Sequence, residues 1–210
     1  MLTLHHLEYS RSQRVLWLLE ELDVPYELVR YPRTAKFRAP PELGKVHPLG
    51  KSPVLVDGDL MLAESSVILR YLNDRYGEGR FAPHAGTPEY WQHDEWLEFV
   101  ESSAVLPVMV GVLGQMTGEG GPGLESFCDS EAGKMLAYLA DALSDRPFLM
   151  GGEVMLADIQ MTYFLDMAST AGLLDSFPVL QAYLERLMKQ PGFQRAEKKG
   201  GPMKAPARKD

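Results

Sequence analysis

Two short stretches of this chain carry residues whose types and spacing could do chemistry. Residues 47–55 read His-Pro-Leu-Gly-Lys-Ser-Pro-Val-Leu, and Pro53 separates a predicted loop from a predicted strand. Residues 63–68 read Ala-Glu-Ser-Ser-Val-Ile, so Glu64 and Ser65 follow a predicted hairpin and open an apolar helix. Backbone groups beside a proline, a carboxylate and a helix N-terminus can together bind a small peptide-like ligand.

An α/β unit must position these stretches. Its predicted order is strand, helix, strand, an irregular stretch, two strands and a helix. The first helix has apolar residues at helical spacing, and the last two strands flank Asp-Gly-Asp, which is a hairpin signal. In chain order the predicted elements are residues 3–6, 13–22, 26–29, 54–56, 60–62 and 65–76.

The chain divides at a linker into this unit and a helical one. We predict an N-terminal α/β domain at 1–76 and a linker at 77–87, where several Gly and Pro residues interrupt all periodicity. An all-helical domain follows at 88–196. Residues 197–210 are basic, contain Gly and Pro, and are predicted to be a flexible tail.

Four long helices are predicted in the second domain. The first is expected to bend near Pro107 and Gly111. A flexible loop is expected at 118–123, which contains four glycines and a proline. The predicted helices are residues 88–116, 125–143, 156–171 and 178–189.

Composition sets the broad class of the protein. The 210 residues are 45% hydrophobic with a formal net charge of −8, which fits a well-cored globular protein and argues against nucleic-acid binding. No apolar run reaches about 18 residues, so no membrane span is expected. The single cysteine, Cys128, excludes internal disulfides and favours a cytoplasmic location. Neighbouring residues 93–95, His-Asp-Glu, point in different directions on a helix, so no metal site is predicted.

In order and at this spacing, the motifs resemble those of the cytosolic glutathione transferases. Residues 8–22, from Glu-Tyr-Ser-Arg-Ser-Gln-Arg onward, are similar to the serine-type and the bacterial or fungal branches of that family. The Pro-Leu-Gly-Lys-Ser-Pro-Val-Leu stretch and the Glu64-Ser65 pair are its most specific local marks. The resemblance covers about residues 2–193. It implies an α/β thioredoxin-like N-terminal domain followed by an all-α helical C-terminal domain.

The resemblance also implies a thiol-activating serine. The glutathione thiol has an ordinary pKa near roughly 8.5, so little of it is thiolate at neutral pH. A hydroxyl at a helix N-terminus stabilises the thiolate through a hydrogen bond and the helix dipole. Ser10 is the expected catalytic donor, because it stands in a Ser-x-x-x-Arg frame with Arg14, itself expected to form a structural ion pair. Ser10 could instead only cap the helix, and the alternates are Tyr9 and Ser12, with Ser12 better explained as the cap.

A glutathione-binding set is implied in the same way. Pro53 is expected to be cis and to turn the backbone of Ser52 toward the cysteinyl unit. Glu64 would accept from the γ-glutamyl ammonium group, and Ser65 would donate to its carboxylate from its hydroxyl and N–H. Lys51 is a candidate partner for the glycyl carboxylate. Without the resemblance to the family, the same residues would be interpreted as a trans proline, a capped helix with a solvated acid, and an exposed lysine.

One position departs from the family pattern. In residues 151–159, Gly-Gly-Glu-Val-Met-Leu-Ala-Asp-Ile, the family has Ser or Thr where this chain has Met155. A Met side chain has no oxygen to cap the next helix. We predict that Asp158 reaches back to backbone N–H groups, and that water or another group supplies the missing acceptor.

The implied function is that of a dimeric glutathione transferase in detoxification. It would transfer the glutathione thiolate to a small hydrophobic electrophile or a peroxide, with glutathione as co-substrate and no cofactor. Apolar side chains of residues 88–116 would contribute to the electrophile pocket. A non-catalytic glutathione-binding or regulatory protein on the same fold is the alternative. A glutathione-dependent isomerase or dehalogenase is a third class, and the electrophile, the family class and residues shared across a dimer interface stay open.

Overall fold

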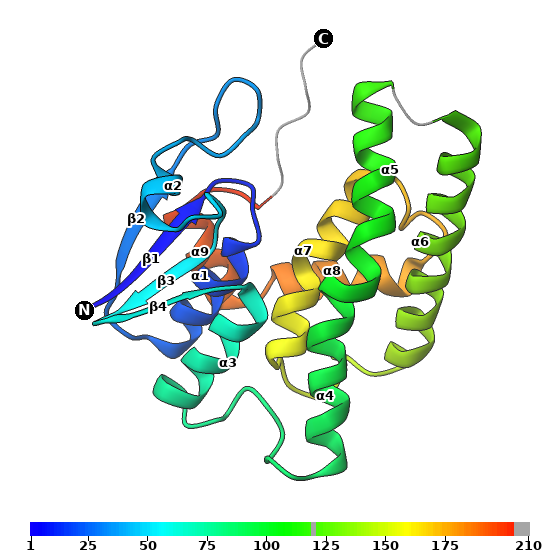
Figure 1. Cartoon of the computed structure of the whole chain (residues 1–210). Coiled ribbons are helices and arrows are strands. Elements are labelled where there is room, and N and C mark those ends of the chain that lie inside the picture. Colours follow the sequence, from blue (N-terminus) through cyan, green and yellow to red (C-terminus); the bar gives the residue numbers. More distant parts are fainter. Residues whose placement is uncertain (119–120, 204–210) are drawn as a thin grey trace. The chain divides into compact units, whose positions relative to one another are not determined.

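The computed structural model describes residues 1–118 and 121–203, apart from the side chains of Gln115 and Met116. It divides into two compact units (Figure 1). The first comprises residues 1–80 together with the segment that begins at Lys189, and the second comprises residues 81–188. Part of the predicted loop at 118–123 and the last seven residues of the predicted tail lie outside the described residues.

A mixed four-stranded sheet forms the centre of the first unit. Its strands are β1 (Leu2–Leu7), β2 (Glu27–Tyr31), β3 (Val54–Asp57) and β4 (Leu60–Ala63). They stand in the order β2-β1-β3-β4; β1 is parallel to β2 and antiparallel to β3, and β3 and β4 form the predicted hairpin. Helix α1 (Ser12–Leu22) connects β1 to β2, short α2 (Leu43–Val46) lies in the stretch predicted to be irregular, and α3 (Ser65–Tyr76) follows β4. The predicted α/β fold of the N-terminal part is therefore confirmed.

Helix α1 is buried on nearly every side. Ten of its eleven residues are buried, including Trp17 and Arg14 at 1% exposure each. It contacts β1, α3 and a C-terminal helix, α9 (Pro191–Gly200). Figure 1 shows α9 beside α1, although the two helices are far apart in the sequence. The apolar spacing of α1 predicts a helix with one buried side; the cover provided by α9 explains why the other side is buried too.

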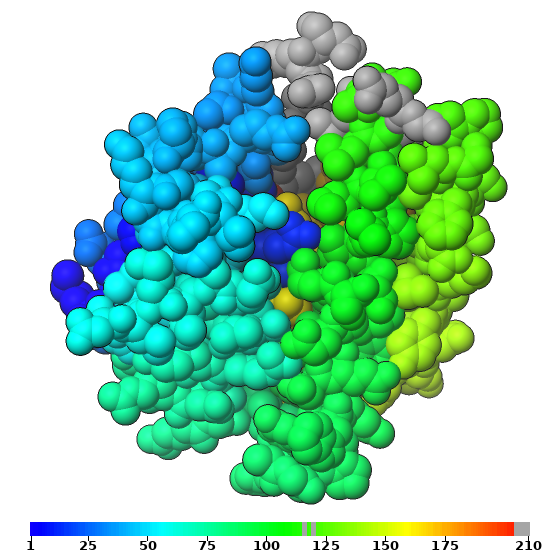
Figure 2. All heavy atoms as spheres, in the orientation of Figure 1, coloured from blue at the N-terminus to red at the C-terminus, as the bar shows by residue number. Residues whose placement is uncertain are grey.

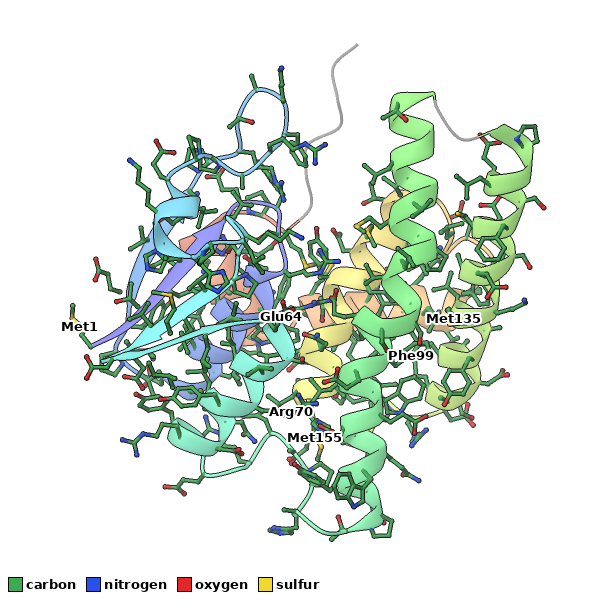
Figure 3. All side chains as sticks on the ribbon, viewed as in Figure 1. Met1, Glu64, Arg70, Phe99, Met135 and Met155 are labelled. Carbon is green, nitrogen blue, oxygen red and sulfur yellow. The ribbon has the colours of Figure 1, made fainter. Side chains whose placement is uncertain are left out.

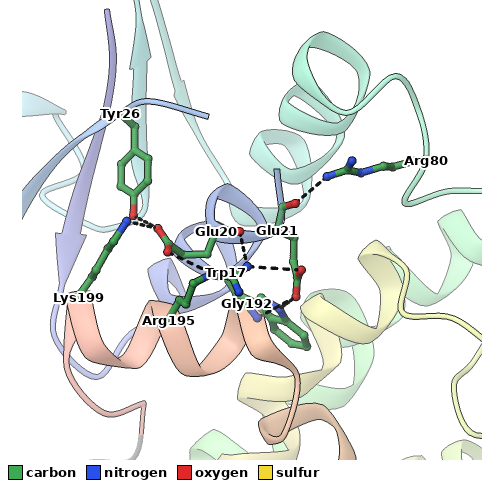
Figure 4. A network of polar contacts seen from close by, with 8 residues as sticks. All are labelled: Trp17, Glu20, Glu21, Tyr26, Arg80, Gly192, Arg195 and Lys199. Atoms are coloured by element: carbon green, nitrogen blue, oxygen red, sulfur yellow. Dashed lines mark hydrogen bonds and ion pairs between the residues drawn. The ribbon is translucent and has the colours of Figure 1, made fainter. Parts of the chain in front are cut away.

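A carboxylate on α1 is the polar centre of this contact (Figure 4). Glu20, which is 6% exposed, accepts a hydrogen bond from the Tyr26 hydroxyl at 2.5 Å. Lys199 Nζ on α9 lies 2.6 Å from the same oxygen, and Arg195 Nε lies 3.7 Å from the other. Two cations and a phenol therefore compensate the buried charge.

Two glycines allow α9 to approach α1 closely. An added Cβ at Gly192 would lie 2.3 Å from the Glu21 carboxyl group, and one at Gly200 would lie 2.5 Å from Leu16 Cδ2. Glu21 Oε1 accepts from Trp17 Nε1 at 2.9 Å and from Gly192 N at 3.2 Å. A larger residue at either glycine would require the Glu21 or Leu16 side chain, or helix α9 itself, to shift.

The structure differs from the predicted division at the C-terminal end. The predicted bounds place residues 191–196 in the helical domain and 197–200 in the tail, yet these residues form helix α9, which belongs to the first unit. Its Lys and Gly composition favours flexibility. The contact that orders it, Lys199 with Glu20, joins residues 179 positions apart and is invisible to local patterns.

Replacing Glu20 with alanine is expected to reduce the free energy of unfolding by about 1–2 kcal/mol. The Tyr26 hydroxyl loses its acceptor, but Lys199 and Arg195 are 53% and 47% exposed and can return to water. Urea unfolding measures the change. The control is Glu131→Ala, which breaks an exposed pair with Lys134 and should change stability by less than about 0.5 kcal/mol. Equal losses in both variants would contradict the assigned role of Glu20.

The second unit is helical, as predicted. Its helices are α4 (Pro88–Phe99), α5 (Val105–Thr117), α6 (Gly121–Leu143), α7 (Leu156–Thr170) and α8 (Pro178–Met188). Helix α7 contacts α4, α5 and α8, and α5 contacts α6. Eleven of the fifteen residues of α7 are buried, so α7 is central to this core.

The irregularity predicted near Pro107 and Gly111 lies one turn earlier. Val100–Ala104 forms a π-helical turn that joins α4 to α5. Pro107 has no N–H, and its ring crowds the carbonyl four residues before it, that of Ser103. The wider π turn contains that residue.

Segment Pro88–Gly114 is, among the described residues, long and apolar enough to cross a membrane by length and composition alone. Its most apolar 18-residue window has a mean hydropathy of 1.5 and is 33% buried. Core helices of soluble proteins satisfy the same criterion. Figure 2 shows α4 and α5 in green. Exposed apolar side chains on these two helices include Trp91 on α4 and Leu106 and Leu113 on α5.

The N-terminus of α7 has acceptors despite the methionine at its cap. Met155 is the N-cap residue (Figure 3). Leu156 N donates to Phe81 O at 2.9 Å, and Ala157 N donates to Nε2 of buried His93 at 3.2 Å. His93, on α4, is therefore a group that supplies an acceptor in place of a capping oxygen.

Asp158 also acts as predicted. Its carboxylate accepts from Met155 N at 2.9 Å, from Leu149 N at 3.0 Å and from the Tyr183 hydroxyl. Burial raises the pKa of Asp158, while these hydrogen bonds act in the opposite direction. The carboxylate thus connects the start of α7 to the preceding loop and to α8.

Substituting threonine for Met155 is expected to stabilise the protein by about 0.5 kcal/mol. The gain is smaller than for an empty cap, because His93 and Asp158 already bond N–H groups here. Calorimetry should show a higher Tm for Met155→Thr than for Met155→Val, which has the same shape without the oxygen. A Tm for the threonine variant at or below that of the valine variant would refute the prediction.

Candidate functional site

The turn between β1 and α1 contains the first predicted site residues. Tyr9 has a φ of 53°, which reverses the chain, and Ser10 follows with 6% exposure. Ser10 Oγ donates to Leu7 O at 2.7 Å, accepts from Ser12 N at 3.2 Å and lies 2.8 Å from Ser12 Oγ. The Ser10 hydroxyl therefore lies at the N-terminus of α1, where the helix dipole favours a negative charge.

Ser12 is the first residue of α1 and does not cap it, which corrects the predicted cap. The N-cap position is Arg11, which makes no side-chain cap hydrogen bond among the described residues. The Ser12 hydroxyl lies against β1. Ser12 Oγ lies 2.8 Å from His6 Nδ1 and 3.2 Å from Leu7 O, and Ser12 is 0% exposed.

His6 connects this turn to the C-terminal helix. It is 1% exposed on β1, and its Nε2 lies 3.2 Å from Gly200 O at the end of α9. Burial lowers the pKa of His6 to about 4. The imidazole is therefore neutral at neutral pH.

The Ser52–Pro53 peptide bond is cis, as the resemblance implies. Ser52 Oγ donates to His5 O at 2.8 Å and accepts from Leu7 N at 3.0 Å, so the proline loop is bonded to the end of β1. Lys51 is exposed.

Glu64 and Ser65 stand where β4 passes into α3, and Figure 3 labels Glu64. Glu64 is exposed with a φ of 70°, and Ser65, the first residue of α3, is 4% exposed. Arg14 Nη1 donates to Ser65 Oγ at 3.2 Å, so Arg14 joins α1 to α3. Ser65 Oγ is the acceptor in that bond, so its own hydrogen can still be donated.

Tyr9, the other candidate donor, lies against the following loop. Its ring stacks on Phe37 with centroids 6.0 Å apart. Arg33 Nη2 donates to Tyr9 O at 2.7 Å, and the Arg33 guanidinium lies 4.5 Å from the centroid of the Phe37 ring. These contacts engage both the ring and the backbone of Tyr9.

Three segments that are distant in sequence meet at Leu7 and Arg14. The Leu7 amide donates to Ser52 Oγ, and the Leu7 carbonyl accepts from Ser10 Oγ. Arg14 adds the start of α3 through Ser65. A hydroxyl at one helix start, a second helix start and a nearby carboxylate fit a ligand with both anionic and ammonium groups. Among the described residues, no group of three His, Cys, Asp or Glu side chains could hold a metal ion.

Sequence reasoning missed the contribution of His6. Side chains on a strand alternate between faces, so His6 shares a face with Leu2 and Leu4, both buried. A polar residue at a buried strand position needs a partner, and this was the available signal. Its partners, Ser12 and Gly200, could not be inferred from local pattern.

The chain matches two family models. They are the N-terminal domain of glutathione S-transferase over residues 1–74 and the C-terminal domain of glutathione S-transferase over residues 127–191. Glutathione S-transferase 3 of Schizosaccharomyces pombe is 32% identical over 176 residues, which cover 78% of this chain and 72% of that protein. Glutathione S-transferase 1 of Saccharomyces cerevisiae is 28% identical over an alignment of 222 positions, which covers 95% of this chain and 95% of that protein.

Solved structures of glutathione transferases are similar to this chain as well. A glutathione S-transferase from Actinobacillus pleuropneumoniae is 31% identical with a TM-score of 0.89, over 97% of this chain and 95% of that one. A glutathione transferase from Phanerochaete chrysosporium, solved with oxidized glutathione, is 25% identical with a TM-score of 0.80, over 94% and 93% of the two chains. The turn at Ser10, the cis proline and the start of α3 occur in a chain that matches both domains of one family in order, and this protein belongs to the glutathione S-transferase family.

Proposed function

We propose that the protein is a glutathione transferase in which Ser10 stabilises the glutathione thiolate for attack on a small apolar electrophile. In the substitution form of this reaction, the sulfur lone pair forms a C–S bond and the leaving group departs with the electrons of its own bond. The protein contributes by increasing the thiolate fraction. Each unit by which the thiol pKa falls corresponds to about 1.36 kcal/mol of preferential thiolate stabilisation.

The observation that carries the proposal is the position of the Ser10 hydroxyl. It lies at the N-terminus of α1 and bonds Leu7 O, whose amide bonds the proline loop through Ser52. A hydroxyl that turns from a carbonyl to a thiolate gains a charge-assisted hydrogen bond, and the helix dipole adds to it. Ser12 is a weaker candidate for this role, because it is 0% exposed and its hydroxyl lies 2.8 Å from His6.

The glutathione contacts are assigned to the other predicted residues. Ser52, followed by Pro53, would pair its backbone with the cysteinyl unit. Ser65 would donate from its N–H and hydroxyl to the γ-glutamyl carboxylate, and exposed Glu64 would accept from the ammonium group. Lys51, exposed on the same loop, would accompany the glycyl carboxylate. The relative solved with oxidized glutathione supports this ligand class.

The test is titration of the thiolate absorbance of glutathione bound to the wild-type protein, together with mass spectrometry of the product formed with 1-chloro-2,4-dinitrobenzene. A thiol pKa below the free value of about 8.5 and a conjugate formed with turnover are expected. Binding without a lowered pKa or turnover would favour a non-catalytic glutathione-binding protein. Absence of glutathione binding would overturn the proposal.

A peroxide is the second substrate class for the same thiolate. Two glutathione molecules would reduce one hydroperoxide to an alcohol and water, with glutathione disulfide as the oxidised product. A coupled glutathione reductase assay measures that disulfide. We also propose that the protein is a homodimer that acts in detoxification in the cytoplasm, and sedimentation at several concentrations would test the dimer.

A further inference from the structure

We propose that His6 is a positioning residue for thiol activation, which acts through Ser12 to hold the Ser10 hydroxyl as a donor to the glutathione sulfur. The inference rests on the proposed function, because it concerns the same serine. It adds the buried chain Gly200–His6–Ser12–Ser10, which joins the end of α9 to the start of α1.

The order of hydrogen atoms in this chain follows from its two ends. Gly200 O can only accept, so His6 Nε2, 3.2 Å away, carries a hydrogen. Burial keeps the imidazole neutral at neutral pH, so Nδ1 has no hydrogen and accepts. The neighbour of Nδ1 is Ser12 Oγ at 2.8 Å, so the Ser12 hydroxyl donates to His6.

This order determines what Ser10 can do. Ser12 has one hydroxyl hydrogen and donates it to His6 Nδ1. Ser12 Oγ can therefore act toward Ser10 only as an acceptor. Ser10 Oγ accepts from Ser12 N, and its own hydrogen can go to Leu7 O, to Ser12 Oγ or to a bound sulfur. A thiolate is the strongest acceptor of the three, because the hydrogen bond to it is charge-assisted.

Loss of His6 would disturb this arrangement. The buried Ser12 hydroxyl would have to donate to Leu7 O, at 3.2 Å, or to Ser10 Oγ, at 2.8 Å. Both of these groups hold Ser10 in place. Ser10 would lose its single orientation, and small errors in the placement of a donor reduce the stabilisation that it gives.

The C-terminal helix is built to make the contact with His6. A Cβ on Gly200 would lie 2.9 Å from His6 Nε2 and 2.5 Å from Leu16 Cδ2, so a larger residue would require His6 or Leu16 to move. Lys199, the preceding residue, is bonded to Glu20 on α1. Helix α9 is therefore attached to the helix whose N-terminus carries Ser10, and it supplies the carbonyl that sets the tautomer of His6.

The test compares His6→Leu with His6→Asn, two variants of similar shape. Both lose the ring and its contact with Gly200, but only asparagine can place an acceptor near the position of Nδ1. Leucine is expected to raise the pKa of the bound glutathione thiol by about one unit, and asparagine by clearly less. Affinity for S-methylglutathione, which has no thiol, should stay within about twofold in both, because the binding contacts remain.

Ser12 provides an independent route to the same answer. The small change Ser12→Ala should also raise the pKa of the bound thiol. Adding His6→Leu to Ser12→Ala should raise that pKa no further, because the effect of His6 passes through Ser12. If His6→Leu fails to fold, Ser12→Ala alone decides. ¹⁵N spectra of histidine-labelled wild-type protein should show neutral His6 with its hydrogen on Nε2.

The outcomes separate this inference from the proposed function. A lowered thiol pKa in wild type that stays unchanged in His6→Leu and in Ser12→Ala would overturn the inference and leave the proposed function intact. A hydrogen on Nδ1 of neutral His6, or equal effects of leucine and asparagine, would also overturn it. A wild-type protein that binds glutathione without lowering the thiol pKa would remove the proposed function itself.

Discussion

Replacing Ser10 with alanine is expected to raise the pKa of the bound glutathione thiol toward about 8.5 and to lower kcat/KM near neutral pH by up to about 30-fold, because a thiol of that pKa is only about 3% thiolate at pH 7. The substitution removes a hydroxyl that lies at the N-terminus of α1 and bonds Leu7 O at 2.7 Å. The contacts proposed for the peptide portion of glutathione, at Ser52 and Ser65, remain. The loss should therefore fall on thiolate stabilisation and not on affinity for glutathione.

The pH dependence gives this prediction its sharpest readout. Activity should follow the thiolate fraction, so the rate of Ser10→Ala should rise toward the wild-type rate as pH increases past about 8.5. The control is Ser130→Ala, on an exposed position of α6, whose profile should match the wild type. If Ser10→Ala retains the wild-type thiol pKa, the donor is Tyr9, Ser12 or a backbone N–H, and the role given to Ser10 is wrong.

Acid is expected to destabilise the protein through His6 by about 3 kcal/mol between about pH 7.5 and pH 4. The pKa of His6 lies near 4 in the folded protein, below its ordinary value of 6.5, mainly because of burial. Arg30 also lowers this pKa, whereas the Gly200 carbonyl and Glu8 raise it. As pH falls below about 6.5, the unfolded chain binds a proton that folded His6 does not, so the stability present at higher pH is lost.

A comparison with His6→Asn isolates this contribution from those of other groups. Burial also lowers the pKa of His5, and burial raises the pKa of Asp158, so the total acid response is a sum of opposing effects. Urea unfolding of both proteins at several pH values gives the difference directly. The wild type should lose about 3 kcal/mol more than His6→Asn on acidification, and parallel curves would show that His6 titrates alike in both states.

The sequence by itself determined most of the helices and strands and most of the candidate ligand-binding residues. Helical spacing in α1 and the Asp-Gly-Asp turn between two apolar runs are local patterns, and local patterns specify local structure. The frames around Ser10, Pro53 and Glu64-Ser65 pointed to a glutathione site, because their order and spacing match a family of known chemistry. The missing capping oxygen at Met155 could also be recognised from the sequence, because a side-chain cap needs an oxygen and methionine has none.

Only the tertiary structure decided which partner each polar group takes. His93 bonds the N-terminus of α7, Glu20 binds Lys199, and His6 bonds both Ser12 and Gly200. The contacts made by Lys199 and Gly200 arise because α9 belongs to the first unit, which local patterns at the two ends of the chain do not predict. A buried polar side chain must find a partner, but the partner is chosen by which distant segment covers it.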